Sequence, residues 1–291
     1  MSENLSSSPA IKELNYKSFT VIRDMLYKNF GIELKDGKRS LVQSRLNKLL
    51  RIKNFNTFEN YIFYLKNDTS GRSLVELSTY LTTNHTHFNR EPAHFDMFEK
   101  KVLPEHIELQ EKKKNLDLRI WCAGCSSGEE SYMLAMLTQE VLGSRFSSWE
   151  ASLLATDLSE KVLDISKKGI YTEERVSDIP KKLLKKYFEQ LPDGNFKAVD
   201  SLRRYIIYRR FNFMHEFPFK KQFNIIFCRN VMIYFDEETK ANLVRKFHKS
   251  LVIGGYLFVG HSETFRNIKE LTFVAPGVYK KGPNDYCQQS Y

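Results

Sequence analysis

The chain has 291 residues, enough for one large domain or two of ordinary size, and its 42% hydrophobic content excludes a collagen-like, low-complexity or acidic disordered chain. Its longest nearly uncharged apolar stretch, 250–260, is about half the roughly 20 residues that cross a bilayer, and residues 1–8 do not resemble a secretory signal. The formal net charge of +10 favours acidic partners, whether nucleic acid, anionic lipid or acidic protein. We therefore expect a cytoplasmic protein without membrane insertion.

The first 81 residues carry only helical patterns. Residues 1–10 are polar and Ser-rich, and we expect a disordered lead there. In 11–81 the apolar residues recur at spacings of three and four, which predicts a small N-terminal all-helical domain. Its expected helices cover about 15–30, 38–52, 57–66 and 73–81.

The helix expected at 38–52 carries a basic stripe. Arg45, Lys48 and Arg51 follow one another at three-residue steps, roughly opposite its apolar side. Such a stripe is either an ordinary solvated surface or a binding surface for an acidic partner, and the local sequence leaves both interpretations open.

A different pattern begins after the polar segment 82–92, which we expect to be a linker. A helix predicted at 93–111 is followed by apolar strands that alternate with helices. This alternation indicates a doubly wound, mostly parallel, Rossmann-like α/β domain over 93–291. The expected strands are 118–123, 151–156, 223–228 and 256–259, and the helices between and around them begin at about 129, 159, 180 and 236.

One region interrupts the alternation of strands and helices. The short apolar segments 196–199 and 204–210 are separated by turn residues, and Asp193 and Gly194 precede them. They resemble a small antiparallel hairpin or three-stranded flap, so we expect an inserted β-subdomain at about 191–212.

Polar residues follow three of the expected strands, where an open parallel sheet binds its ligands. After the first strand, the small-residue loop 124–128 leads into Glu129 and Glu130. These carboxylates would repel a pyrophosphate but could accept hydrogen bonds from an amino group, which argues against a nicotinamide dinucleotide. Asp157 closes the second strand, where it would hold ribose hydroxyls or cap the next helix. Together with Arg229 and Asn230 after the third strand, these residues indicate S-adenosylmethionine (SAM).

Two cysteines near the same loop have the spacing of a redox or zinc pair. No second pair and no nearby His completes a tetrahedral zinc set for Cys122 and Cys125, and the acidic neighbours disfavour a reactive thiolate. We therefore expect no metal, and we interpret both cysteines as small residues that line the bend.

Five segments resemble the CheR-type chemotaxis receptor methyltransferases: 82–91, 126–132, 155–159, 227–235 and 260–263. They follow the family's order, and the similarity covers nearly the whole chain, including the helical front domain. The resemblance implies a protein-glutamate O-methyltransferase that uses SAM and releases S-adenosylhomocysteine (SAH). Its substrates would be glutamate side chains on the cytoplasmic helical domain of chemoreceptors, methylated in sensory adaptation.

The same resemblance implies a set of site residues. Asn84, Thr86 and Arg90 would contact SAM from the linker, Glu129 would bind its amino group and Asp157 its ribose. The remaining residues of the implied cofactor pocket are Asn212 and Phe213, beside the adenine, and Arg229 and Asn230.

Little catalytic chemistry is needed for the implied reaction. A glutamate, with an ordinary pKa near 4.3, is already ionised at pH 7, so no general base is required. Positioning of the two reactants can contribute roughly 7–11 kcal/mol. We expect Arg90 to orient either the attacking carboxylate or the carboxylate of SAM, and Tyr234 to orient the substrate or to pack beneath its loop. The stripe of Arg45, Lys48 and Arg51 would bind the acidic receptor surface.

Three departures from the family pattern qualify this interpretation. Asn89 replaces a second Phe and Ser131 replaces a Pro, but neither change removes a polar ligand. The connection at 198–203 lacks the Gly-rich extension of members that dock on a receptor tether peptide. The sequence therefore favours an enzyme that does not depend on such a tether.

Two other functions fit parts of the sequence. A nucleic-acid methyltransferase would also combine a SAM site with a basic surface, but the segment 229–232 lacks the prolines typical of enzymes that methylate exocyclic amines. A non-catalytic SAM-binding signalling module would retain the fold without activity. The intact set of Arg90, Glu129, Asp157 and Asn230 argues against lost catalysis.

Overall fold

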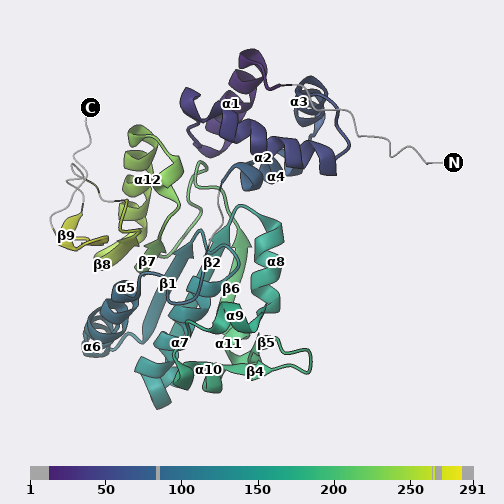
Figure 1. The fold of residues 1–291 in the computed structure, drawn as a ribbon. Helices are drawn as coiled ribbons and strands as arrows, with labels where there is room; N and C mark the ends of the chain where they lie inside the picture. The colour runs from purple at the N-terminus through teal and green to yellow at the C-terminus, as the bar shows by residue number, and fades with distance from the viewer. Residues whose placement is uncertain (1–12, 83–85, 264, 266–270, 284–291) are drawn as a thin grey trace. The chain divides into compact units, whose positions relative to one another are not determined.

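The computed structural model describes residues 13–82, 86–263, 265 and 271–283 (Figure 1). Backbone contacts divide the chain into two units, Met1–Asn84 with Tyr234–Asp236, and His85–Ile233 with Glu237–Tyr291. The lead expected at 1–10 lies outside the described residues. Among the described helices, none is long and apolar enough to span a membrane.

Within its described residues, the first unit contains four α-helices. Asn15 caps the first of them by accepting a hydrogen bond from Ser18 N at 2.8 Å, and Gly31 ends it in a left-handed conformation. The apolar stripes of the helices meet in a buried core, which confirms the all-helical front domain. The helices are α1 (Tyr16–Phe30), α2 (Arg39–Ile52), α3 (Phe58–Asn67) and α4 (Arg72–Leu81).

A short segment from late in the chain completes this unit. Phe235 pairs with Ile32 in an isolated antiparallel bridge, and Glu33 N donates a hydrogen bond to the Tyr234 carbonyl at 2.8 Å. The Tyr27 hydroxyl donates to Asp236 Oδ2 at 2.7 Å. Backbone pairing thus fixes the chain around Tyr234, at the end of the short helix η4 (Met232–Tyr234).

A seven-stranded sheet forms the centre of the second unit, in the order β6-β2-β1-β7-β8-β10-β9. The first five strands of this order run parallel, and β10 is antiparallel to both of its neighbours. The mostly parallel sheet is confirmed, whereas the C-terminal hairpin was not expected. The strands are β1 (Asp117–Ala123), β2 (Glu150–Asp157), β6 (Ile206–Arg210), β7 (Phe223–Cys228), β8 (Leu251–Val259), β9 (Thr272–Ala275) and β10 (Val278–Lys280).

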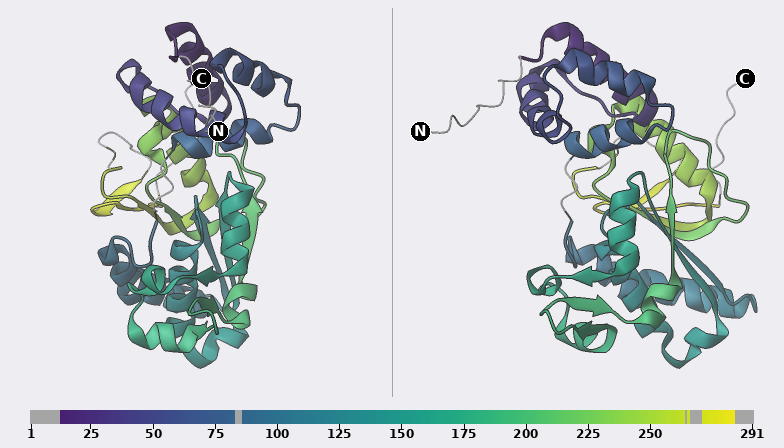
Figure 2. Two further views of the ribbon diagram at one scale, coloured as in Figure 1. Left: turned by 45° about the vertical axis from the view of Figure 1, so that its right-hand side comes forward. Right: turned by 90° about the vertical axis from the view of Figure 1, so that its right-hand side faces the viewer.

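Helices cover both faces of this sheet (Figure 2). Strand order reverses between β1 and β7, so loops from both halves meet at the carboxyl ends of these two strands. The helices that follow the strands are α7 (Glu129–Leu142), α8 (Glu160–Lys168) and α12 (Glu237–Ser250).

The helix expected at 93–111 is interrupted. It consists of α5 (Pro92–Met97), a π-helical turn η2 (Phe98–Val102) and α6 (Leu103–Lys112). Pro104 lacks a backbone N–H and its ring crowds the carbonyl four residues earlier, so the chain widens just before it. The sequence pattern predicted helix here but not this local change of hydrogen bonding.

The predicted flap is corrected at one strand. The small antiparallel sheet has the order β3-β5-β4, and its strands come from Ile170–Tyr171, Phe196–Ala198 and Phe188–Gln190. The segment expected as its last strand, 204–210, instead ends α11 (Asp200–Tyr205) and forms β6, which pairs in parallel with β2. The prediction rested on the turn residues between the two apolar segments, but β6 is an edge strand of the large sheet and, among the described strands, pairs only with β2.

Two further helices lie beside the strands of the small sheet. The four-residue helix α9 (Glu173–Val176) follows β3, and α10 (Lys181–Tyr187) precedes β4. The helix expected to begin at about 180 ends at Tyr187, because the next three residues join the small sheet as β4.

Candidate functional site

The loop between β1 and α7 is tightly turned at the strand ends. Gly124 and Gly128 have φ angles of 85° and 100°, a region that favours glycine. A Cβ on Gly124 would lie 2.4 Å from Val231 Cγ2, so no side chain fits there. The Gly124 and Cys125 amides both donate to the Thr156 carbonyl, at 2.8 and 2.9 Å. These contacts hold the loop against the end of β2.

The two cysteines at this bend are buried free thiols. Burial raises the pKa of both Cys122 and Cys125 well above the ordinary value, and neighbouring carboxylates raise it further. Neutral, buried thiols fit the interpretation of small lining residues rather than a redox pair.

Asp157 ends β2 beside this loop. Its Oδ2 accepts a hydrogen bond from Ser126 N at 2.9 Å, and its Oδ1 accepts one from Ser159 N at 3.0 Å. Ser159, not Asp157, is the N-cap residue of α8, so the alternative role as a helix cap is wrong. Burial raises the pKa of Asp157, although the backbone donors oppose that effect. Each carboxylate oxygen retains a lone pair for a further donor.

The two glutamates that open α7 point to different partners. The Glu129 side chain is fully buried, accepts a hydrogen bond from Ser127 Oγ at 2.8 Å and forms an ion pair with Arg175 of α9. Glu130 accepts from Cys122 Sγ at 3.3 Å, and burial raises its pKa. Nothing in the local sequence of α9 marked Arg175 in advance, because only the fold brings it to Glu129.

Arg229 joins three segments of the site. Its side chain is 1% exposed, and its Nε lies 3.4 Å from a carboxylate oxygen of both Glu91 and Glu130. Its Nη2 donates to the Arg90 carbonyl, and its guanidinium lies 5.1 Å from the centre of the Phe95 ring. The arginine thus links the linker, the start of α7 and the end of β7.

Glu263 fixes the loop after β7. Its carboxylate accepts backbone hydrogen bonds from Asn230 at 2.7 Å, Gly260 at 2.8 Å and Ile233 at 3.0 Å. Burial raises its pKa, and these backbone donors oppose the rise. The motif at 260–263 contained this residue, but the sequence did not reveal that it holds Asn230 in a left-handed conformation, with φ of 59°.

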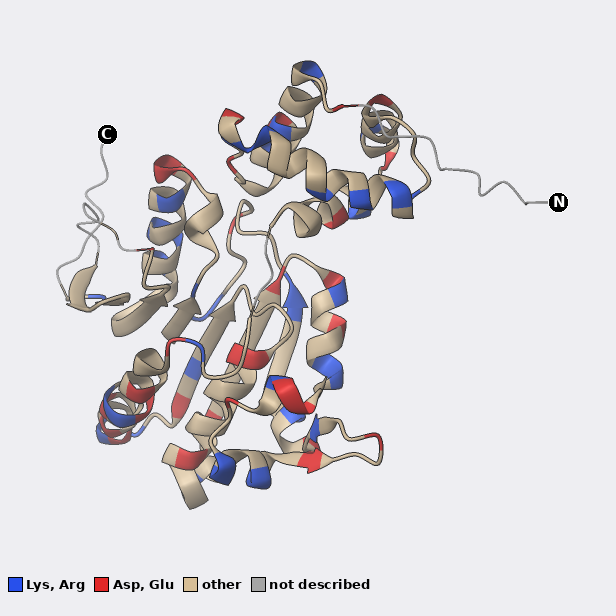
Figure 3. Cartoon of the chain, in the orientation of Figure 1, with Lys and Arg blue, Asp and Glu red and all other residues tan. Residues whose placement is uncertain are grey.

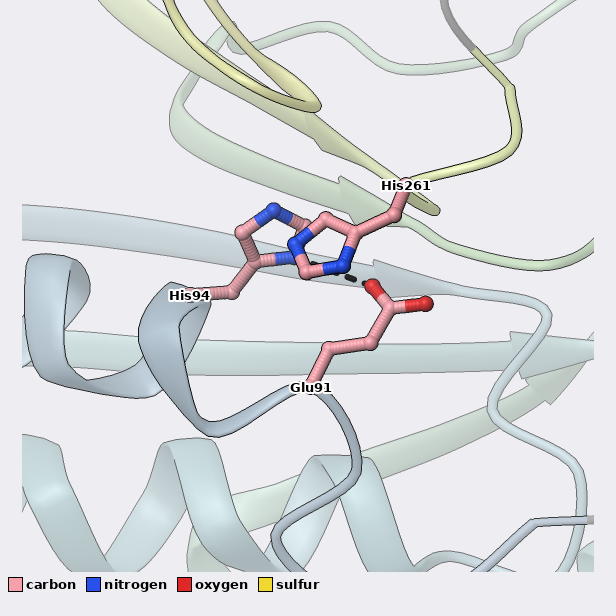
Figure 4. A group of neighbouring side chains, drawn as sticks. All are labelled: Glu91, His94 and His261. Carbon is pink, nitrogen blue, oxygen red and sulfur yellow. Dashed lines mark ion pairs between the residues drawn. The ribbon is translucent and has the colours of Figure 1, made fainter.

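Glu91, His94 and His261 form a compact group (Figure 4). Their ligand atoms lie within 4.8 Å of one another, so these are residues that could hold a metal ion. His94 Nδ1 lies 3.3 Å from Glu91 Oε2, and its Nε2 lies 2.9 Å from the Pro276 carbonyl oxygen. Burial opposes ionisation of Glu91, but His94, Arg229 and an Asn230 hydrogen bond outweigh it and lower its pKa to about 2. Arg229 already neutralises the Glu91 carboxylate, which is the only carboxylate in this group that could bind a metal ion.

The other predicted site residues lie near these loops, except Asn84, which lies outside the residues that the structure describes. Phe211 N donates to the Asp157 carbonyl at 2.9 Å, which brings Asn212 and Phe213 to the end of β2. Phe213 packs with its ring centre 6.2 Å from that of Trp121, and Asn212 Oδ1 accepts from Met214 N at 3.0 Å. Thr86 and Arg90 are half-buried in the linker.

The structure therefore gathers most of the predicted cofactor residues at one edge of the sheet. The segments meet at the carboxyl ends of β1, β2, β6 and β7, around the point where strand order reverses. Residues 84–278 match the family model of the CheR methyltransferase SAM-binding domain, and residues 17–82 match that of the CheR methyltransferase all-alpha domain. The chain belongs to the CheR methyltransferase family. SAM as the cofactor and the resemblance found in the sequence are thereby confirmed.

Curated relatives share this membership over nearly their whole length. The chain is 45% identical to the chemotaxis protein methyltransferase of Borreliella burgdorferi over 88% of this chain and 91% of that protein. It is 32% identical to the chemotaxis protein methyltransferase of Escherichia coli over 92% of this chain and 89% of that protein. Among solved structures, a SAM-dependent methyltransferase from Mesorhizobium loti aligns with 49% of this chain and 46% of its own, with 18% identity and a TM-score of 0.30.

Proposed function

We propose that this member of the CheR family transfers the methyl group of SAM to glutamate side chains on the cytoplasmic helical domain of chemoreceptors. The observation that carries the proposal is the pair of acids, the fully buried Glu129 and the half-buried Asp157, that close the SAM-binding edge of the sheet. The names of the curated relatives support a chemotaxis substrate. The domain division at 11–81, 82–92 and 93–291 is part of the same proposal, whereas the insert expected at about 191–212 is not, because β6 belongs to the large sheet and the small sheet takes its strands from 170–171, 188–190 and 196–198.

The acids fit the polar groups of SAM. Oε1 of Glu129 is buried and forms an ion pair with Arg175, at the position where the cofactor's amino group would bind instead. Asp157 would accept from the ribose hydroxyls, and Phe213 with Asn212 would flank the adenine. Thr86, Arg90 and Asn84 would contact SAM from the linker. The loop of Arg229 and Asn230, whose polar groups Glu91 and Glu263 hold, would shape the remaining wall.

The chain's contribution to the reaction is binding and alignment. SAM supplies a methyl group on a sulfonium, and a substrate glutamate is already an anion at pH 7. Arg90 would orient either that carboxylate or the carboxylate of SAM, and Tyr234 would orient the substrate. Exclusion of water from the attacking oxygen and alignment with the methyl carbon would account for most of the rate.

The receptor surface would lie on α2. Lys48 and Arg51 are exposed and line a groove of about 700 Å³ with Ser44 and Asn47. Figure 3 shows where the basic and acidic positions lie along the chain. Arg45 is half-buried instead, and its Nη1 donates to the Leu81 carbonyl at 2.5 Å. We therefore assign most of the long-range attraction for an acidic receptor helix to Lys48 and Arg51, and only a share to Arg45. Recruitment of this cytoplasmic enzyme to receptor arrays would follow, without a tether peptide.

One experiment tests the reaction class. The full chain is incubated with radiolabelled SAM and receptor-containing membranes, and the labelled product is treated with alkali. Release of labelled methanol identifies a carboxyl methyl ester and supports the proposal. Label on protein that is stable to alkali would show N- or C-methylation and contradict the proposal. Label transferred to RNA or DNA would indicate a nucleic-acid methyltransferase instead. Absence of transfer despite measurable SAM binding would indicate the non-catalytic signalling module.

A further inference from the structure

Arg175 lies where a ligand cation is expected. It belongs to the short helix α9 and forms an ion pair with Oε1 of Glu129, the buried oxygen that receives no directed hydrogen bond from the described residues. Its Nη2 also donates to Ser127 Oγ at 2.7 Å, and its guanidinium lies 5.1 Å from the centre of the Tyr171 ring. The Arg175 side chain is 36% exposed, whereas the Glu129 side chain is 0% exposed.

We propose that Arg175 is an exchangeable counter-cation for Glu129, which neutralises this carboxylate in the absence of SAM and gives way to the amino group of SAM when the cofactor binds. The inference rests on the proposed role of Glu129. It adds a residue that sets cofactor affinity through another residue, and so acts as a positioning and competing group rather than a catalytic one.

Charge and burial together require such an exchange. A fully buried carboxylate without a cation is costly, so Glu129 needs a partner whether or not a ligand is bound. Two cations on one buried oxygen would repel each other at short range, so the ammonium group and Arg175 compete for Oε1. The arrival of the ligand therefore displaces the guanidinium.

The Arg175 side chain can move to a solvated position when it leaves Glu129. One side of the residue already meets solvent, and Glu173 and Glu174 of the same helical turn are exposed carboxylates. Burial lowers the pKa of Arg175, because the present position removes part of its hydration. Movement outward restores that hydration, which keeps the cost of the exchange small.

The test measures binding of two ligands by isothermal titration calorimetry on the full chain. The ligands are SAH and an analogue in which hydrogen replaces the α-amino group. Arg175→Met removes the charge but keeps an aliphatic side chain over Tyr171. We expect it to tighten SAH by about twofold to fivefold, the range of an ion pair with one partly exposed partner, and to leave the analogue unchanged. Arg145→Met, which removes a surface partner of Glu111 beyond the other end of α7, is the matched control and changes neither ligand.

Two results overturn the exchange. Unchanged or weakened SAH binding by Arg175→Met would show that the arginine is structural or helps to hold the ligand. An equal gain for SAH and the analogue would show a general opening of the site. Arg175→Lys, which keeps the charge, should bind SAH as the wild-type does, and thermal unfolding without ligand checks that each variant is folded.

Glu129→Gln separates this inference from the proposed function. If it weakens SAH but not the analogue, Glu129 binds the amino group, and the Arg175→Met result then decides the exchange alone. In that background Arg175→Met should give no further gain, because the competition no longer exists. If Glu129→Gln weakens both ligands equally or neither, the proposed role of Glu129 fails and the exchange fails with it.

Discussion

Arg229 and the pair of Lys48 and Arg51 are cations of one chain in opposite surroundings. Arg229 is almost completely buried and lies between the carboxylates of Glu91 and Glu130, so its charge holds the site together. Lys48 and Arg51 project from α2 into solvent. A buried charge contributes to stability because its removal leaves its partners buried without an opposite charge. An exposed charge is hydrated, so it adds little to stability but can attract a charged binding partner. The net charge of +10 therefore combines two different kinds of contribution.

The largest effect that separates buried from exposed cations is expected for Arg229→Met. Loss of the guanidinium leaves two largely buried carboxylates without their shared cation, and we expect the free energy of unfolding to fall by about 3–5 kcal/mol. Urea unfolding followed by circular dichroism measures the change. Arg51→Met, an exposed control, should stay within about 0.5 kcal/mol of wild-type. Equal effects of the two substitutions would contradict the division between buried and exposed cations.

The second prediction concerns the acid side of the same network. The pKa of Glu91 falls from its ordinary 4.5 to about 2, so its ionised form stabilises the folded state at neutral pH by about 3 kcal/mol. Because the folded pKa is the lower one, this stability is complete above pH 4.5 and disappears as the pH falls toward 2. The stability gap between wild-type and Glu91→Gln, measured by urea unfolding from pH 7 to pH 3, should narrow below pH 4.5.

A neighbouring acid provides the control for that pH profile. Burial raises rather than lowers the pKa of Glu263, so a Glu263→Gln variant should show no such narrowing as the pH falls. A gap for Glu91→Gln that stays constant down to pH 3 would mean that the carboxylate gains no stabilisation from Arg229 and His94.

An intermediate effect is expected at Arg45. This residue belongs to the basic stripe in sequence, but its guanidinium binds the last carbonyl of α4, where a cation also favours the helix end. Arg45→Met should lower the free energy of unfolding by about 1 kcal/mol. Lys48→Met, one turn further along α2, is the control and should leave stability unchanged. If the two variants were equally stable, Arg45 would contribute no more to stability than the exposed Lys48.

The smallest energetic effect, and the one most relevant to substrate, is expected for Lys48→Glu combined with Arg51→Glu. Exposed ion pairs contribute about 0.2–1 kcal/mol each, so the KM for receptor should rise about twofold to tenfold while kcat and stability change little. The difference from wild-type should shrink at high salt. Lys66→Glu on α3 introduces the same kind of charge reversal elsewhere in the unit and should leave KM unchanged. If the KM for receptor were unchanged by the double charge reversal and independent of salt, Lys48 and Arg51 would be ordinary solvated surface residues.

Local patterns determined much of this molecule. Apolar spacings of three and four placed α1 to α4, because an amphipathic helix must bury one side whatever it packs against. Apolar runs bounded by Gly and acidic residues placed β1, β2 and β7 and thereby the edge that carries Glu129, Asp157 and Asn230. The family motifs then identified the cofactor.

Only the tertiary structure decided which distant residues and strands are paired. Glu263 holds the Asn230 loop, Arg175 reaches Glu129 from α9, and the strand of Tyr208 joins β2 instead of the small sheet. Each of these contacts joins residues from 33 to 53 positions apart in the chain, so no local periodicity records them. Burial then makes such pairs energetically decisive, because a charge that leaves water must find its partner within the fold.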